Sequence, residues 1–183
     1  KTKVEAQQKV RPTLKLYNHE TNMRERAGWR TAFDHAKGEV LVLLAGDLQS
    51  PPEEIPKVLA PVTEEGFDLG TGFRSNRQDG VYYWLATRIL NLFMRVVFGT
   101  QTQDVSSSFF AVKQKFVKNM DMIENDHRYI LAIFVRRGAS MKEVPFKHAA
   151  RVAGKSHYNK SKVLYAVPEI ARFWMRWSKG YYD

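Results

Sequence analysis

The sequence predicts an α/β fold in which a mostly parallel sheet is flanked by helices. The first observation is the apolar run at residues 40–44, which lies between Gly38 and Gly46 and is too short to favour a helix. We interpret it as a strand buried on both faces, as in a parallel sheet covered by helices. The second observation is that strand and helix patterns alternate along the chain. The third is that 183 residues, 44% of them apolar and 13% aromatic, suit one domain with an appended segment.

The N-terminal region is predicted to contain a helix end, a strand and a second helix. Residues 1–9 are typical of the end of a helix, and residues 10–17 mix β-branched and apolar side chains around Pro12, which favours a strand. Residues 21–37 carry an imperfect helical stripe that Gly38 can terminate.

A further helix is expected directly after the apolar run. Ser50 is a suitable N-cap, and Glu53 follows it at the capping-box spacing. Pro51 and Pro52 suit the first turn of a helix. Ligands of open α/β sheets bind in the crevice beyond the carboxyl ends of the strands, and the turn between this strand and this helix contains Asp47. Asp47 is therefore the first candidate for chemistry.

The remaining patterns continue the alternation of strands and helices. In chain order, we expect a helix that turns Ile55, Val58, Leu59 and Val62 inward, a strand at 67–73, a helix from Val81 to Val96 ended by Gly99, a short strand at 109–112, helices beginning at 115 and at 127, a strand at 141–146, and a helical segment at 161–179 that Pro168 kinks or divides into two helices.

The composition limits the classes of function. Lys and Arg exceed Asp and Glu by 29 − 19 = 10, so an anionic partner is expected, whether nucleic acid, a membrane surface or a phosphorylated substrate. The absence of cysteine excludes disulfides and thiolate metal sites. The five histidines lack zinc-ligand spacing, and the Walker and dinucleotide glycine motifs are absent, which weakens kinase and dehydrogenase hypotheses. No apolar run approaches the roughly 20 residues that cross a bilayer.

Five segments, taken in order, resemble one known family. They are Asn18 with Ala27-Gly-Trp and Ala36-Lys-Gly38, then Asp47-Leu-Gln-Ser-Pro-Pro-Glu-Glu-Ile-Pro56, Gly72-Phe-Arg-Ser-Asn-Arg-Gln-Asp79, Asp104-Val-Ser-Ser-Ser-Phe-Phe-Ala111 and Arg151-Val-Ala-Gly-Lys-Ser156. The second is similar to the Asp-Ala-Asp-Leu-Gln-x-Pro-Pro-Glu segment of inverting family 2 glycosyltransferases with the GT-A fold. The similarity is strongest to the polyprenyl-phosphate sugar transferases, which act on dolichyl or undecaprenyl phosphate.

The resemblance implies a GT-A fold with a Rossmann-like sheet. It implies a catalytic domain over residues 1–160, in which the family's first strand, helix and strand, the part that binds the nucleotide base, are not seen in this sequence. Residues 161–183 are expected to form amphipathic helices.

The resemblance also implies a cation site at the end of the apolar strand. Asp47 and Gln49 match family positions that hold Mg²⁺ or Mn²⁺ against the two phosphates of the donor. The alternative for Asp47 is a loop residue that satisfies backbone amides. Ala45 stands where the family has its first motif Asp, so weaker metal binding is expected.

Asp104 is the candidate catalytic residue by the same resemblance. It is expected either to orient the incoming nucleophile or to act as a base, and the alternative is an Asx turn before Ser106. Residues expected to bind substrate phosphates are Arg74, Arg88, Arg151, Lys155 and Ser156. Arg88 is equally compatible with an ion pair on its own helix.

The C-terminal segment combines aromatic and basic side chains at helical spacing. Arg172, Trp174, Arg176 and Trp177 are predicted to lie on a membrane surface. The alternative is a helix packed on the catalytic domain or on another subunit.

Together these features favour a metal-assisted, inverting transfer of a sugar from a nucleotide diphosphate sugar to a polyprenyl phosphate at the cytoplasmic membrane face. One alternative is transfer to a saccharide hydroxyl, which needs a true base. The other is a catalytically impaired binding or scaffold protein. No nucleic-acid partner is expected, because no nucleic-acid-binding module is recognised. Homo-oligomerisation is left open.

Overall fold

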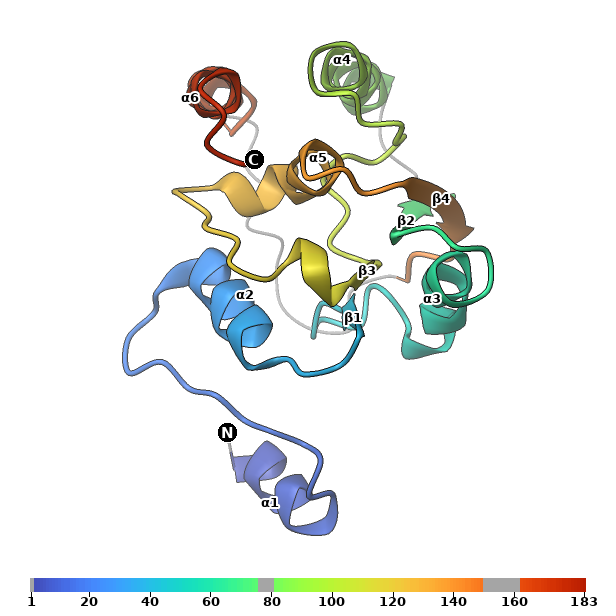
Figure 1. The fold of residues 1–183 in the computed structure, drawn as a ribbon, viewed down its shortest axis with the longest axis vertical. Coiled ribbons are helices and arrows are strands. Elements are labelled where there is room, and N and C mark those ends of the chain that lie inside the picture. Colours follow the sequence, from blue (N-terminus) through green and yellow to red (C-terminus); the bar gives the residue numbers. More distant parts are fainter. Residues whose placement is uncertain (1, 76–80, 150–161) are drawn as a thin grey trace.

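A four-stranded sheet surrounded by helices forms the body of the protein (Figure 1). The structure is a computed structural model that describes residues 2–75, 81–149 and 162–183. Its elements in chain order are α1 (Thr2–Val10), α2 (Arg24–His35), β1 (Val40–Leu43), η1 (Pro52–Glu54), α3 (Ile55–Thr63), β2 (Leu69–Arg74), α4 (Val81–Phe98), β3 (Phe110–Lys113), η2 (Gln114–Phe116), η3 (Asp126–Tyr129), α5 (Ile130–Arg136), β4 (Met141–Phe146) and α6 (Lys162–Ser178).

The sheet confirms the predicted α/β class and adds one antiparallel strand. The strand order is β1-β3-β2-β4, with β3 antiparallel to both of its neighbours and β2 parallel to β4. Strands β1, β2 and β4 therefore run in one direction, and β3 runs against them. As a result, the carboxyl ends of three strands and the amino end of β3 meet at one edge of the sheet.

The two faces of β3 organise the core. Phe110 and Val112 pack with Leu131 and Phe134 of α5 on one face. Ala111, the alternate residue, packs on the other face in a cluster with residues of α3. This is the period of two expected for a buried strand. Residues 130–134 of α5 are all buried, because α5 lies between the sheet and the outer helices α4 and α6 (Figure 1).

Two N-terminal predictions are wrong. Residues 10–17 form no strand, since the chain leaves α1 and continues as an extended, mostly exposed segment that pairs with no described strand. The apolar run does form β1, but it is not buried on both faces. Val42 is 36% exposed, because β1 lies at one end of the described sheet and pairs with β3 alone there.

The predicted capping box is also wrong. No side-chain cap is seen at the start of η1 or of α3, and the α-helix begins only at Ile55. Pro51 is extended, with φ −63° and ψ 138°. A residue that precedes proline is driven away from helical angles, and both Ser50 and Pro51 precede a proline. The chain therefore enters α3 through a 3-10 turn.

The helix expected to begin at 115 is only the 3-10 turn η2, so that prediction is wrong. The other predicted helices and strands are present, with two differences at the outer helices. The apolar stripe of α4 is largely exposed, at 61% for Ile89, 61% for Leu92 and 77% for Val96, whereas Met94 and Phe98 are buried. The C-terminal segment is a single helix that continues through Pro168, and not two. Within the described ranges, no helix is both long and apolar enough to cross a membrane.

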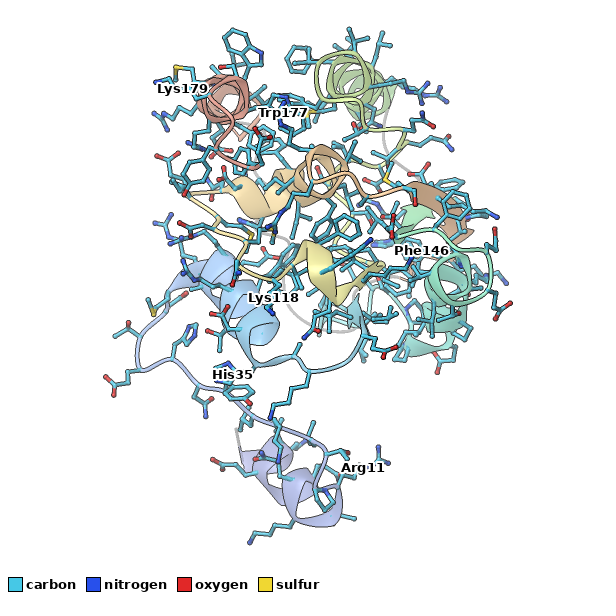
Figure 2. All side chains as sticks on the ribbon, in the orientation of Figure 1. Arg11, His35, Lys118, Phe146, Trp177 and Lys179 are labelled. Atoms are coloured by element: carbon cyan, nitrogen blue, oxygen red, sulfur yellow. The ribbon has the colours of Figure 1, made fainter. Side chains whose placement is uncertain are left out.

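Gly72 shows how closely the sheet packs near the edge where the carboxyl ends of β1, β2 and β4 meet the amino end of β3. A Cβ atom there would lie 2.8 Å from Cδ1 of Phe109 and 2.8 Å from Cδ1 of Phe146, a pair of rings in edge contact (Phe146 is labelled in Figure 2). We expect Gly72→Ala to lower the free energy of unfolding by about 1–3 kcal/mol, through overpacking. Gly28→Ala, in α2, meets nothing within 4 Å and should be neutral or stabilising by up to about 1 kcal/mol. Urea denaturation of the two variants measures this, and equal effects would contradict the packing assignment.

Candidate active site

Asp47, Arg74 and Asp104 lie near the edge of the sheet where the carboxyl ends of β1, β2 and β4 meet the amino end of β3. Register explains this arrangement, because Leu43 of β1 and Thr71 of β2 both pair with Phe110 of β3. Asp47 follows β1 and Arg74 ends β2, while Asp104 precedes β3. Leu43, Phe110 and Thr71 thus lie side by side across the sheet. Asp47, Arg74 and Asp104 each lie a few residues beyond them, on the same side of the sheet.

An ion pair between Arg74 and Asp104 is the best-defined feature of this edge. Nε of Arg74 lies 2.7 Å from Oδ2 of Asp104, and Nη2 lies 2.9 Å from Oδ1, so the contact is bidentate. Asp104 is 3% exposed. A bidentate pair with a guanidinium fixes the plane of the carboxylate as well as its position.

The loop that carries Asp104 is held at both ends. The N–H of Asp104 donates to Oγ1 of Thr102 (3.0 Å), and the carbonyl of Asp104 accepts from the N–H of Ser107 (2.9 Å). The hydroxyl of Ser107 donates to the carbonyl of Gly72 in β2 (2.6 Å). The turn after Asp104 is therefore closed by the backbone carbonyl of Asp104, whereas the carboxylate of Asp104 contacts Arg74.

A cleft of about 560 Å³ opens beside this pair. It is lined by Phe73, Arg74, Ser75, Thr87, Arg88, Ile89, Asn91, Leu92, Arg95, Thr102, Gln103 and Asp104. Arg88 and Arg95 are separated by two helical turns and so lie on one face of α4. Sequence reasoning selected Arg74, Arg88 and Asp104 and missed Arg95, although its spacing of seven residues from Arg88 was a usable signal. A cleft lined by three arginines and one aspartate suits an anionic ligand.

Asp47 and Gln49 lie in a tight turn after β1. Oδ1 of Asp47 accepts the backbone N–H of Gln49 (3.2 Å), and Leu48 between them has φ +59°. The carbonyl of Gln49 accepts the N–H of Ala149 (2.9 Å), which ties this turn to the chain after β4. The backbone-amide alternative for Asp47 is thus observed.

The donor set of this turn is suited to a hard cation only in part. It offers one carboxylate and one amide oxygen, and the described residues contain no cluster of three His, Cys, Asp or Glu side chains. Mg²⁺ is often held by one or two carboxylates, with substrate phosphates and water completing the shell. The turn fits a cation of that kind, bound together with a phosphorylated ligand.

Three predicted phosphate-binding residues, Arg151, Lys155 and Ser156, lie outside the described residues.

The four predicted membrane-surface residues on α6 divide into two pairs. Arg172 and Trp174 are exposed, and Arg172 lies 3.7 Å from Glu124. Trp177 lies between α6 and α4 (Figure 2), with its ring centroid 4.9 Å from that of Phe98. Arg176 faces the body of the protein, as described next. For Arg176 and Trp177 the alternative of packing on the domain therefore holds.

Arg176 is tied to a buried network. It contacts the fully buried carboxylate of Asp126 and donates from Nε to the hydroxyl of Tyr182 (2.8 Å). That hydroxyl donates to Oδ2 of Asp126 (2.7 Å). Burial, reinforced by Asp126 and offset in part by Arg176, raises the pKa of Tyr182 above its ordinary value, so the phenol remains a donor. This network fixes the end of α6 on η3.

Comparison with protein-family models matches residues 1–121 to the family described as Glycosyl transferase family 2. Curated relatives include the undecaprenyl-phosphate 4-deoxy-4-formamido-L-arabinose transferases of Salmonella paratyphi B and Salmonella newport. Each is 33% identical over 146 residues, which are 78% of this chain and 43% of the relative. The chain thus spans less than half the length of these relatives.

Solved structures with a similar fold include two complexes of glucosyl-3-phosphoglycerate synthase from Mycobacterium tuberculosis. The complex with Mn²⁺, UDP-glucose and glycerol 3-phosphate has a TM-score of 0.55 at 16% identity over 81% of this chain and 52% of that one. The complex with Mg²⁺ and UDP has a TM-score of 0.54 at 15% identity over the same shares. Likeness at this level concerns the fold, and it agrees with the GT-A prediction.

Proposed function

The chain belongs to glycosyl transferase family 2, and we propose that the protein transfers a sugar from a nucleotide diphosphate sugar to a polyprenyl phosphate. The observation that carries this proposal is the Arg74–Asp104 pair in a cleft that Arg88 and Arg95 also line. The names of the undecaprenyl-phosphate relatives support the acceptor class, and the UDP-glucose complexes of the structural neighbours support the donor class.

The chemistry assigned to the cleft is an inverting displacement. An oxygen of the acceptor phosphate forms a bond to the anomeric carbon as the bond from that carbon to the nucleoside diphosphate breaks. A phosphate acceptor is already anionic near neutral pH, so little proton abstraction is required. Asp104 then serves chiefly to orient the reacting groups through Arg74, and Arg88 and Arg95 bind phosphate oxygens.

Apolar side chains in the cleft support a lipid acceptor over a free saccharide. Ile89 and Leu92, each 61% exposed, line the cleft beside Arg88. Val96 continues the same exposed face of α4 by one more turn. A phosphate bound by the arginines could therefore extend its prenyl chain over this face, which suits an apolar tail better than a sugar.

A divalent cation is assigned to the turn after β1. Asp47 and the side-chain oxygen of Gln49 would hold Mg²⁺ or Mn²⁺ together with oxygens of the donor diphosphate. When bound, the cation neutralises negative charge on the departing diphosphate. The metal complexes of the structural neighbours support this assignment.

A second candidate function keeps the fold and the donor but uses a saccharide hydroxyl as acceptor. The buried carboxylate of Asp104 is the observation that favours it, because a hydroxyl needs a base. The two candidates differ in how strongly activity depends on that carboxylate.

Attachment to the cytoplasmic membrane surface is assigned to α4 and α6 together. Both helices lie at the same end of the molecule (Figure 1), where Val96, Trp174 and Met175 are exposed. Exposed cations on the same helices, Arg95 and Arg172, suit an anionic lipid surface, at on the order of 1 kcal/mol per cation. This differs from the sequence prediction, because Arg176 and Trp177 are replaced by residues of α4.

The activity test uses the full-length protein, Mg²⁺ or Mn²⁺, a panel of nucleotide diphosphate sugars, and polyprenyl phosphate or an oligosaccharide. We expect nucleoside diphosphate release that requires the polyprenyl phosphate. Asp104→Asn should lower kcat by about 10- to 100-fold while donor binding is retained. Asp121→Asn, an exposed carboxylate paired with Arg30, is the matched control. If the protein turns over none of the nucleotide sugars, the proposal is refuted. If it turns them over only with the oligosaccharide as acceptor, and Asp104→Asn abolishes that activity, the second candidate function is favoured.

The cation assignment is tested by Ala45→Asp, which adds a carboxylate where the family motif has one. We expect Mn²⁺ affinity, measured by calorimetry with a nucleoside diphosphate present, to rise roughly tenfold, because an additional charged ligand tightens a hard-cation site. Ala32→Asp adds the same charge on an exposed position of α2 and should change nothing. Unchanged affinity in Ala45→Asp would count against the turn as the metal site.

Membrane attachment is tested by vesicle sedimentation with anionic and neutral lipid. The double variant Val96→Gln/Trp174→Gln should reduce binding to anionic vesicles by about tenfold, since two apolar side chains no longer enter the interface. Val10→Gln removes an equally exposed valine on α1, at 76% exposure, and should bind as the parent does. The membrane-surface assignment would be refuted if the parent protein does not bind anionic vesicles, or if the double variant and Val10→Gln bind them equally well.

A further inference from the structure

Glu143 reaches from the sheet to the loop that carries Asp104. It lies in β4 and pairs in register with Thr71 of β2. Its Oε1 and Oε2 lie 2.9 and 3.0 Å from the backbone nitrogen of Gln103, and Oε1 lies 3.3 Å from that of Asp104. Sequence reasoning missed this residue, because its partners lie about 40 positions earlier in the chain.

Side chains of the same loop complete the contact. The hydroxyl of Thr102 donates to Oε1 of Glu143 and accepts the N–H of Asp104 (3.0 Å). Nε2 of Gln103 lies 3.4 Å from Oε2. Two successive backbone amides and a hydroxyl therefore converge on one carboxylate, as they do around an anion bound in a backbone nest. Hydrogen bonds to an ionised acceptor are roughly twice as strong as neutral ones.

The consequence is that Asp104 is held from two directions by two neighbouring strands. Glu143 of β4 holds its backbone, and Arg74 of β2 holds its carboxylate. In the β2–β4 register, Thr71 pairs with Glu143 and Arg74 pairs with Phe146, so the two anchors are three residues apart along a parallel pair of strands, about 10 Å. A rigid pair of strands thus sets both the place and the plane of the Asp104 carboxylate.

We propose that Glu143 is a positioning residue for Asp104 in the sugar-transfer reaction. This inference rests on the proposed function. Glu143 is not among the residues that line the cleft, and it acts by keeping residues 102–104 in the geometry that lets Asp104 meet Arg74 at the wall of the cleft. The role needs a carboxylate, because every group that faces it is a donor. An amide in its place would set an N–H₂ group against the N–H of Gln103.

The competing explanation is that Glu143 only fastens β4 to the loop and contributes stability. The two explanations differ in what a mild substitution changes. A stability contact moves the unfolding midpoint and leaves the turnover of folded protein intact. A positioning contact lowers kcat in folded protein, because small displacements of a reacting group are costly, at about 100-fold for 1 Å.

The experiment compares Glu143→Gln with Glu65→Gln in the full-length protein. Glu65 pairs with Lys142, the neighbour of Glu143 in β4, and lies away from the loop, so it controls for loss of a carboxylate at this strand. We expect Glu143→Gln to lower kcat by about 10- to 100-fold, with the KM for the donor changed less than about threefold, and Glu65→Gln to retain parental kcat. A kcat within about twofold of the parent in folded Glu143→Gln protein would overturn the proposal.

Thr102 supplies an independent pair of variants if Glu143→Gln folds poorly. Thr102→Ser keeps the hydroxyl that bridges Glu143 and Asp104 and should retain most activity, whereas Thr102→Val should lose it to the same extent as Glu143→Gln. The double variant Thr102→Val/Glu143→Gln should be no slower than the slower single variant, because the residues act as a unit. Equal activity of the Ser and Val variants would overturn the proposal.

Amide hydrogen exchange separates this inference from the proposed function. Glu143→Gln should speed exchange at Gln103 and Asp104 and leave the β2–β4 ladder protected. If the parent protein shows no transfer activity, the proposed function fails and the positioning role of Glu143 in that reaction fails with it. If the parent is active and exchange at the two amides is unchanged in Glu143→Gln, the positioning inference alone fails.

Discussion

The antiparallel insertion of β3 is the constraint on which the site depends. β3 lies between β1 and β2 with Phe110, Ala111 and Val112 fully buried, so its register cannot slip without exposing one face of the core. Because it runs against its neighbours, the segment that enters it arrives at the edge where theirs end. Asp104 belongs to that entering segment and therefore meets Arg74. In an all-parallel sheet, the residues before a strand would lie at the opposite edge.

Local sequence patterns predicted most elements, since helical stripes and short apolar runs are properties of neighbouring residues. They failed where the outcome depends on distant partners. The strand expected at 10–17 has suitable side chains, but no described strand pairs with it. The direction of β3 is likewise invisible locally, because it is set by register with Leu43 and Thr71. Consecutive prolines overrode the cap signal of Ser50 through the steric effect of each proline on the residue before it.

The candidate site shows the same division. Motif order selected Arg74 and Asp104, which the structure joins, because motifs record residue types at fixed places. The membrane-surface prediction for Arg176 was wrong, because the sequence pattern of an amphipathic helix with aromatic and basic residues is the same whether the helix faces lipid or protein. The position of Arg176 is decided by Asp126, which lies fifty residues earlier, is fully buried and forms an ion pair with the guanidinium. Roles that depend on such long-range contacts require the folded structure.

Charge compensation explains how two carboxylates, those of Glu143 and Asp104, can serve one loop beside a cleft that arginines line. Glu143 receives backbone N–H groups and a hydroxyl, so within the described part of the chain its charge is stabilised by dipoles and not by a guanidinium. Arg74 therefore forms its bidentate contact with Asp104 without competition from that neighbour. A buried charge is costly without compensation, and the guanidinium of Arg74 compensates the charge of Asp104, which is 3% exposed. Because the backbone solvates one carboxylate, Arg74, Arg88 and Arg95 give the cleft a cationic character, which suits the phosphate binding that we propose.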